Sequence, residues 1–154
     1  INADGSGETK LNLSGLNPCC LPDGKILFAS DWRENGEICI ANHDGSELVK
    51  LTNNNAKDYR PRISPDGKKI IFTSDRTGDR DIWIMNLDGS NQRNLTRTSY
   101  ANDGDAKWSP DGKRIIFTTD RDGSYQTYVM YANGDGQRRV SKLGGRYIQP
   151  AWLK

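Results

Sequence analysis

Short apolar runs alternate with polar turns along most of this chain. Residues 70–72 read Ile-Ile-Phe, and residues 82–85 read Ile-Trp-Ile-Met. Such runs are too short for helices, are rich in β-branched and aromatic residues, and are bounded by turn residues. The pattern therefore predicts an all-β chain.

Turn chemistry joins these runs into a unit of four strands. Pro65-Asp66-Gly67 suits a tight turn, because proline fixes φ, aspartate bonds its own backbone and glycine accepts a positive φ. Asp88-Gly89 is a strong hairpin signal between the third and fourth strands. The unit is predicted to be an antiparallel meander of four short strands.

The same unit recurs. The stretch 61–96 is repeated at 109–141, with a shift of 45 residues, and at 21–52, with a shift of 43 or 44. A period of this length indicates a repeat architecture. The second and third strands are apolar at successive positions, so both faces should be covered, whereas the fourth is polar like an exposed edge. Stacked four-stranded sheets of this kind predict the blades of a β-propeller rather than a sandwich.

Three motifs carry a family resemblance: the Ser-Pro-Asp-Gly-Lys turn, the triplet Ser74-Asp75-Arg76 and the hairpin Met85 to Ser90. They resemble the Pro-Asp-type (WD-like) repeats of TolB-like β-propellers. The resemblance implies a ring of six blades and a periplasmic or secreted setting, in which such a propeller links envelope components. It does not specify a function, because propellers host many functions.

The repeat boundaries predict one propeller domain over residues 1–154, with three full blades and partial strands at both ends. Because three blades leave a ring open, either the chain is cut from a longer propeller, two copies assemble, or another chain completes it. Ile1 is not a methionine, which suggests a mature or trimmed product. The predicted parts are 1–13, a partial blade; 17–55, 59–99 and 105–142, three blades; and 148–154, the first strand of a further blade.

Composition limits the classes of function and the disulfide bonds that this chain can have. The formal net charge is +2 with acids and bases interleaved, which argues against a dedicated nucleic-acid binder. No apolar run approaches transmembrane length. Cys19 and Cys20 belong to a first strand and Cys39 to the third strand of the same repeat, beyond disulfide reach, so all three are expected to be small buried hydrophobes.

Catalytic, metal and cofactor sites find little support. His43 is the only histidine and falls at a hairpin tip, and no Gly-x-Ser-x-Gly elbow or His-Glu-x-x-His motif occurs. Asn86-x-Asp88-Gly89 could suggest calcium, but no glutamate follows at the required spacing, and a hairpin explains the motif. We therefore predict a protein that is not an enzyme and has no cofactor.

A partner-binding face is the main functional expectation. In a four-stranded meander, the connections between the second and third strands and between successive repeats emerge on one face, where Tyr, Trp and Arg are typical interface anchors. The favoured function is binding of a protein or peptide through this face or the central channel. The alternatives are the regulatory propeller of a larger prolyl-oligopeptidase-like hydrolase, and a carbohydrate-binding or lyase propeller. The candidate residues are Trp32, Arg33, Tyr59, Arg76, Arg80, Tyr100, Arg121 and Tyr147.

Overall fold

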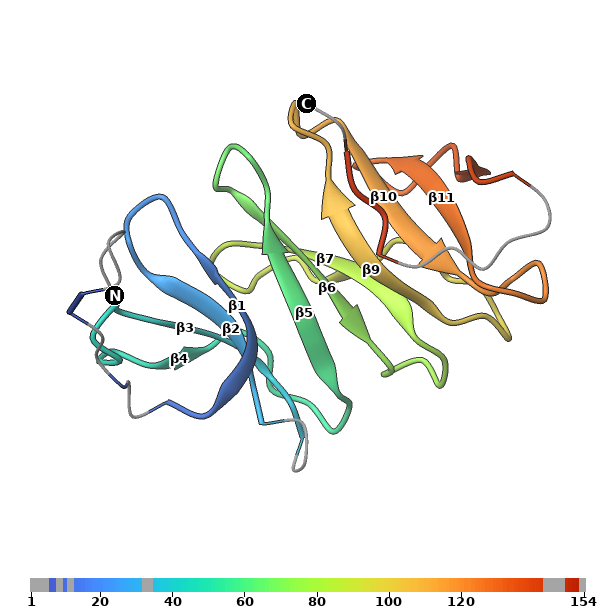
Figure 1. The fold of residues 1–154 in the computed structure, drawn as a ribbon. Helices are drawn as coiled ribbons and strands as arrows, with labels where there is room; N and C mark the ends of the chain where they lie inside the picture. Colours follow the sequence, from blue (N-terminus) through green and yellow to red (C-terminus); the bar gives the residue numbers. More distant parts are fainter. Residues whose placement is uncertain (1–5, 8–9, 11–12, 32–34, 143–148, 153–154) are drawn as a thin grey trace.

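The computed structural model describes residues 6–7, 10, 13–31, 35–142 and 149–152. In this part of the chain, all regular structure is β-strand. The sheets are antiparallel, and each has four strands in sequence order, as the repeat predicts (Figure 1). The strands are β1 (Gly15–Cys20), β2 (Ile26–Ser30), β3 (Ile38–Ala41), β4 (Val49–Lys50), β5 (Asp58–Ile63), β6 (Lys69–Ser74), β7 (Asp81–Asn86), β8 (Arg93–Asn94), β9 (Asp103–Trp108), β10 (Arg114–Thr119), β11 (Gln126–Tyr131) and β12 (Arg138–Arg139).

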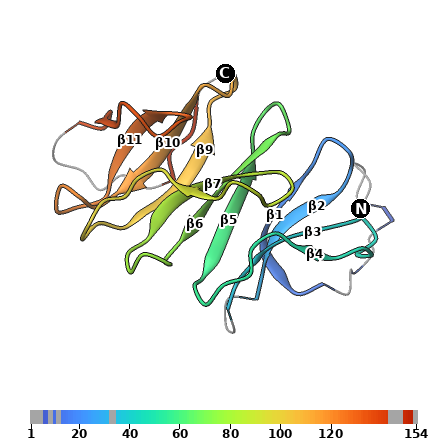
Figure 2. The same cartoon turned by 180° about the vertical axis from the view of Figure 1, so that it is seen from behind.

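The three sheets stand side by side as propeller blades, with β1, β5 and β9 as their innermost strands (Figures 1 and 2). Two apolar cores lie between neighbouring sheets: Ile70 and Phe72 pack with residues of the first sheet, and Ile71 packs with residues of the third. Successive residues of β6 therefore enter different cores, which confirms that both faces of the apolar strands are covered. The short outer strands β4, β8 and β12 are mostly exposed.

Hairpin glycines set the spacing of the sheets. A Cβ atom on Gly89 would lie 2.7 Å from the carbonyl oxygen of Leu51 in the preceding sheet, closer than real Cβ atoms approach backbone. Gln92 Nε2 donates to the same carbonyl at 3.2 Å. The third sheet repeats this contact through Gly134 and Leu95. The Asp-Gly hairpin thus closes a turn and also holds its blade against the one before it.

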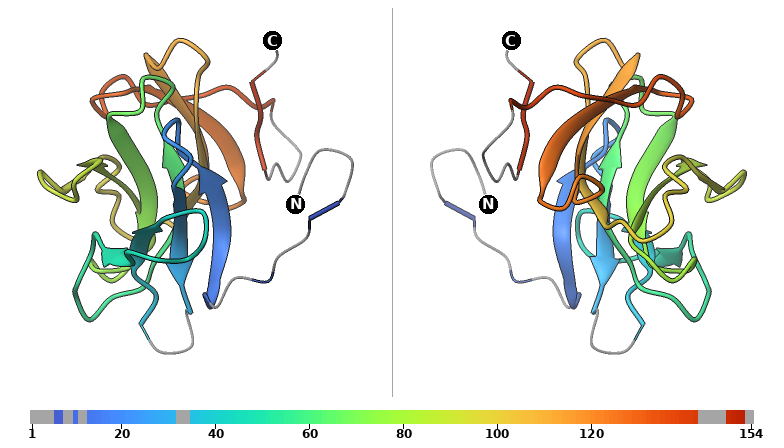
Figure 3. Two further views of the ribbon diagram at one scale, coloured as in Figure 1. Left: turned by 90° about the vertical axis from the view of Figure 1, so that its left-hand side faces the viewer. Right: turned by 90° about the vertical axis from the view of Figure 1, so that its right-hand side faces the viewer.

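Each innermost strand carries a bulge that the sequence does not reveal. The bulged residues Asn17, Arg60 and Asp105 have positive φ angles of 54°, 54° and 51°, and the pairing register shifts at each. Gln149 has the same φ of 54°. The segment 149–152 lies beside β9 (Figures 1 and 3). Trp152 Nε1 donates to the carbonyl of Lys107 in that strand at 3.3 Å.

The cysteines follow the expectation only in part. All three thiols are free. Cys39 is buried, and burial raises the pKa of its thiol. Cys20, however, is exposed, so the expectation of a buried cysteine is wrong there. Cys20 ends the innermost strand, where the side chain borders an open groove instead of a core. Among the described residues, no helix is long and apolar enough to span a membrane.

Candidate partner-binding face

The connections 51–57, 75–80, 95–102 and 120–125 meet at one end of the sheets, and we call this surface the loop face. Aspartates hold the connections together. The backbone amide of Lys57 donates to Asp75 Oδ1 at 2.8 Å, and that of Asn102 donates to Asp120 Oδ1 at 2.6 Å. Asp75 and Asp120 follow the second strands of their sheets, so each bonds the connection after that strand to the connection that precedes the innermost strand.

Two of the candidate arginines form ion pairs beneath this face. Arg76 Nη2 donates to Asp58 Oδ2 at 2.7 Å, and Arg121 Nη2 lies 3.3 Å from Asp103 Oδ1. Both aspartate side chains have no exposed surface, and the two arginines are 19% and 18% exposed. Each aspartate is the first residue of an innermost strand, β5 or β9, which accounts for its burial.

An aromatic ring and a glutamine complete each arginine site. The Arg76 guanidinium lies 4.4 Å from the centre of the Trp83 ring and also donates to Gln92 Oε1 at 2.8 Å. This glutamine also bonds to the preceding sheet, so the arginine is tied to two blades. Tyr128 takes the place of the tryptophan beneath Arg121, at 4.7 Å. These cation–π contacts fix the guanidinium groups, so they stiffen the loop face.

Three side chains of the loop face, next to these arginine sites, form a cleft. Hollows of about 490 and 230 Å³ meet at Tyr59, Arg60 and Arg80. Burial raises the pKa of the Tyr59 phenol, and the neighbouring Arg80 and Arg60 guanidinium groups oppose that rise. Arg60 pairs with Asp105 of the next sheet at 2.5 Å. No acidic side chain of the described residues forms an ion pair with Arg80.

Tyr100 projects from the same face, where it lines a separate hollow of about 740 Å³ with Asp79 and Thr98. Its side chain is 96% exposed, and its backbone has a positive φ of 64°, which is uncommon for a tyrosine. The backbone amide donates to Asp79 Oδ2 at 2.9 Å, which holds the connection 95–102 against 75–80. The ring is therefore presented to solvent from a fixed backbone.

The structure brings together part of the predicted site. Tyr59 and Arg80 line the cleft, Tyr100 lines a separate hollow of the loop face, and Arg76 and Arg121 lie beneath this face. Three candidates lie outside the described residues: Trp32, Arg33 and Tyr147. The predictions missed Asp105, the partner of Arg60, because the two are separated by 45 residues and only the bulges bring them together.

The suggested calcium motif is used internally. Asp88 Oδ1 accepts hydrogen bonds from the amide and hydroxyl of Ser90, at 2.9 and 2.6 Å, and Asn86 Nδ2 donates to the same hydroxyl. Within the described ranges, no group of three or more His, Cys, Asp or Glu side chains could hold a metal ion.

Comparison with known proteins agrees with this geometry. A family model described as the TolB beta propeller domain matches residues 6–98 and 76–154. A TolB homolog of Chlorobaculum tepidum is 36% identical over 91 residues, covering 52% of this chain and 21% of the homolog. The crystal structure of TolB from Acinetobacter baumannii matches with a TM-score of 0.71 at 28% identity, covering 86% of this chain and 33% of that one.

A hydrolase propeller has the same fold. The structure of a puromycin hydrolase matches with a TM-score of 0.69 at 18% identity, covering 85% of this chain and 24% of that enzyme. At this identity the likeness shows the fold alone. The chain spans less than a third of the length of the first curated relatives that it matches.

Proposed function

The chain belongs to the TolB β-propeller domain family, and from this membership we propose that it is a non-catalytic part of a propeller that binds a protein or peptide partner on its loop face. The observation that supports the proposal is the cleft at Tyr59, Arg60 and Arg80, with Tyr100 exposed on the same face. Tyrosine and arginine are enriched among the residues that dominate binding energy at interfaces.

The support beneath the cleft favours this function. A binding site gains affinity when its residues are held in place before the partner arrives. The Asp58–Arg76 and Asp103–Arg121 pairs fix the strand starts below the cleft. Among the described residues, no carboxylate forms an ion pair with Arg80. Its guanidinium group can therefore pair with an acidic group of a binding partner. We therefore propose that the partner presents an acidic or amide side chain to Arg80.

Location and ring completion belong to the same proposal. A periplasmic or secreted location follows from the resemblance to TolB proteins. The outward faces of the first and third sheets keep apolar side chains exposed, with Leu48 53% and Val140 45% accessible. We propose that further blades cover them, either from a longer chain or from a second copy.

The alternative function, as the regulatory propeller of a larger hydrolase, predicts a different property of the loop face. A regulatory propeller would act on access to a catalytic domain, and its loop face would need no peptide affinity of its own. The likeness to puromycin hydrolase rests on the fold alone, so the partner-binding function is the one that the cleft favours.

A random dodecapeptide phage library, selected on the immobilised chain, tests the proposal. Peptides that bind in a saturable manner should lose at least about tenfold in affinity to Arg80→Gln and to Tyr100→Ala. Arg138→Gln is the matched control, because Arg138 is an exposed arginine on the outer strand β12. Selection of no peptide, or of peptides that bind all variants equally, would argue against the proposal.

A further inference from the structure

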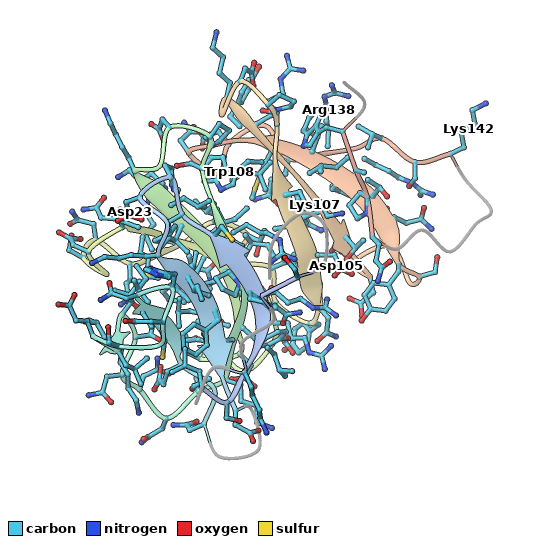
Figure 4. The ribbon with its side chains drawn as sticks, turned by 60° about the vertical axis from the view of Figure 1, so that its left-hand side comes forward. Asp23, Asp105, Lys107, Trp108, Arg138 and Lys142 are labelled. Carbon is cyan, nitrogen blue, oxygen red and sulfur yellow. The ribbon has the colours of Figure 1, made fainter. Side chains whose placement is uncertain are left out.

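A second groove lies at the other end of the innermost strands, away from the loop face. It has a volume of about 530 Å³, and its lining comes from the ends of β1, β5 and β9 and the turns that follow them. Figure 4 shows Lys107 and Trp108 near this end of β9, with Asp105 closer to its start. The residues that matter here are Pro22, Arg62, Ile63, Pro65, Lys107 and Trp108.

The apolar wall of this groove is built by the repeat itself. The Pro-Asp-Gly turns of neighbouring sheets stack, since a Cβ atom on Gly67 would lie 3.4 Å from Pro22 and one on Gly112 would lie 3.6 Å from Pro65. Trp108 is fixed by its indole Nε1, which donates to the carbonyl of Arg62 in the preceding sheet at 3.2 Å. Rigid prolines and an oriented indole offer an apolar surface that needs little reordering on binding.

The charges of the groove have one sign. Arg62 and Lys107 are the charged residues of its lining, and both are cationic. Arg62 Nη1 donates to the backbone carbonyls of Pro61, at 2.8 Å, and Asn17, at 3.5 Å. In the described part of the chain, no carboxylate forms an ion pair with either cation.

The acids of the adjoining turns are already bonded locally, and Asp23 Oδ1 accepts from the Lys25 amide at 3.1 Å. Asp66 Oδ1 accepts from the Ser64 hydroxyl and the Lys68 amide, and the Ser109 hydroxyl donates to Asp111. These bonds lower the pKa of both carboxyl groups and keep them in their turns. The cations therefore face the groove without an acidic counterpart.

We propose that this groove binds an acidic peptide segment of a partner, in which an apolar side chain lies next to a carboxylate. The apolar side chain contacts Trp108 and the stacked prolines. The carboxylate pairs with Arg62 or Lys107 at the edge of the channel. The site is at the opposite end of the blades from the loop face, so it is separate from the proposed function and could be occupied at the same time.

Fluorescence anisotropy with two labelled peptides tests this proposal on the full chain. The acidic probe is Gly-Leu-Asp-Leu-Glu-Gly, and the neutral probe is the same sequence with Asn and Gln in place of Asp and Glu. We expect the acidic probe to bind at least about tenfold more tightly, and to lose this advantage in Arg62→Gln combined with Lys107→Gln.

Control variants and a second ligand keep the test decisive. Lys113→Gln removes an exposed cation of the neighbouring turn and should leave binding of the acidic probe unchanged. Trp108→Phe should abolish the change in tryptophan emission that the acidic probe causes, while circular dichroism reports an intact fold. Equal affinity for both probes, an equal loss in Lys113→Gln, or tighter binding of single-stranded DNA than of the acidic probe would overturn the proposal.

Discussion

Arg76 and Asp58 form a largely buried ion pair, with 2.7 Å between Nη2 and Oδ2, that joins the loop after β6 to the first residue of β5. Asn54 Nδ2 also donates to Asp58 Oδ2 at 2.8 Å, so the carboxylate also holds the connection 51–57 in place. The other oxygen, Oδ1, is buried and finds no partner in the described residues. The carboxylate therefore depends on this arginine for its charge balance.

Arg76→Ala should lower the free energy of unfolding by about 3 kcal/mol, because it leaves a buried carboxylate unpaired. Urea unfolding measures the change. Asp58→Asn combined with Arg76→Ala should be less destabilised than the sum of the two single variants, since neither partner is then left charged alone. Arg138→Ala, on the exposed outer strand, should change the value by less than about 0.5 kcal/mol. An Arg76→Ala effect as small as that of Arg138→Ala would contradict this assignment.

Gly15 occupies the position that Asp58 and Asp103 hold in the other sheets, opposite Ser30. A Cβ atom there would lie 2.4 Å from Phe28 Cδ2 and 2.8 Å from the Ala29 carbonyl oxygen. Gly15→Ala should therefore cost about 1–3 kcal/mol in thermal or urea unfolding.

Gly104→Ala is the matched control for Gly15→Ala, because its added Cβ would meet no atom nearer than 3.8 Å. It should change stability by less than about 0.5 kcal/mol. A Gly15→Ala variant as stable as Gly104→Ala would mean that the first sheet can accept the side chain that its neighbours carry.

The thiols should differ in reactivity. At about pH 8, Cys20 should react with a disulfide reagent at least about 100-fold faster than Cys39, because Cys39 is buried and burial raises its thiol pKa. Cys20→Ser assigns the fast phase. Equal rates for Cys20 and Cys39 in the folded chain would exclude the described packing of β3.

The raised pKa of Cys39 also gives a direction for the pH dependence of stability. The folded chain holds this proton more tightly than the unfolded chain, so the contribution is complete below the unfolded thiol pKa and is lost as pH rises through the folded one. In alkaline solution, the free energy of unfolding should fall less steeply with pH for Cys39→Ala than for the wild type.

Ring completion can be tested by light scattering. The exposed Leu48 lies on the outward face of the first sheet, where the second and third sheets carry Gln92 and Gln137 in its place, and Val140 is exposed on the third sheet. We expect the mass to rise with concentration above the 17.2 kDa of one chain, and to remain at one chain for Leu48→Gln combined with Val140→Gln. A wild-type chain that stays monomeric at every concentration would exclude ring closure by a second copy. Further blades of a longer chain would then have to complete the ring.

The sequence predicts the blades because their signals are local. The turn at Pro65-Asp66-Gly67, the hairpin at Asp88-Gly89 and the apolar runs between them each depend on a few neighbouring residues, and each forms as expected. The repeat then extends these local predictions to the other two sheets. Fold class therefore follows from the sequence alone.

The cleft was less predictable, since it depends on contacts between repeats. Asn17, Arg60 and Asp105 share a bulge but no type of side chain, so no motif marks the position that brings Arg60 to its partner. Asp58 follows a polar loop, yet it is buried at the start of an innermost strand, where Arg76 pairs with it. Side chains at element ends are where local patterns inform least about burial.

We propose that the loop face binds a partner at the cleft. The most direct test is a titration of the ¹⁵N-labelled chain with a peptide selected on it, followed by amide chemical shifts. We predict saturating shifts at Tyr59, Arg80 and Asn102, with the amides of β4, β8 and β12 unchanged. Shifts confined to the outer strands, or their absence at these three amides when the peptide is saturating, would contradict the claim.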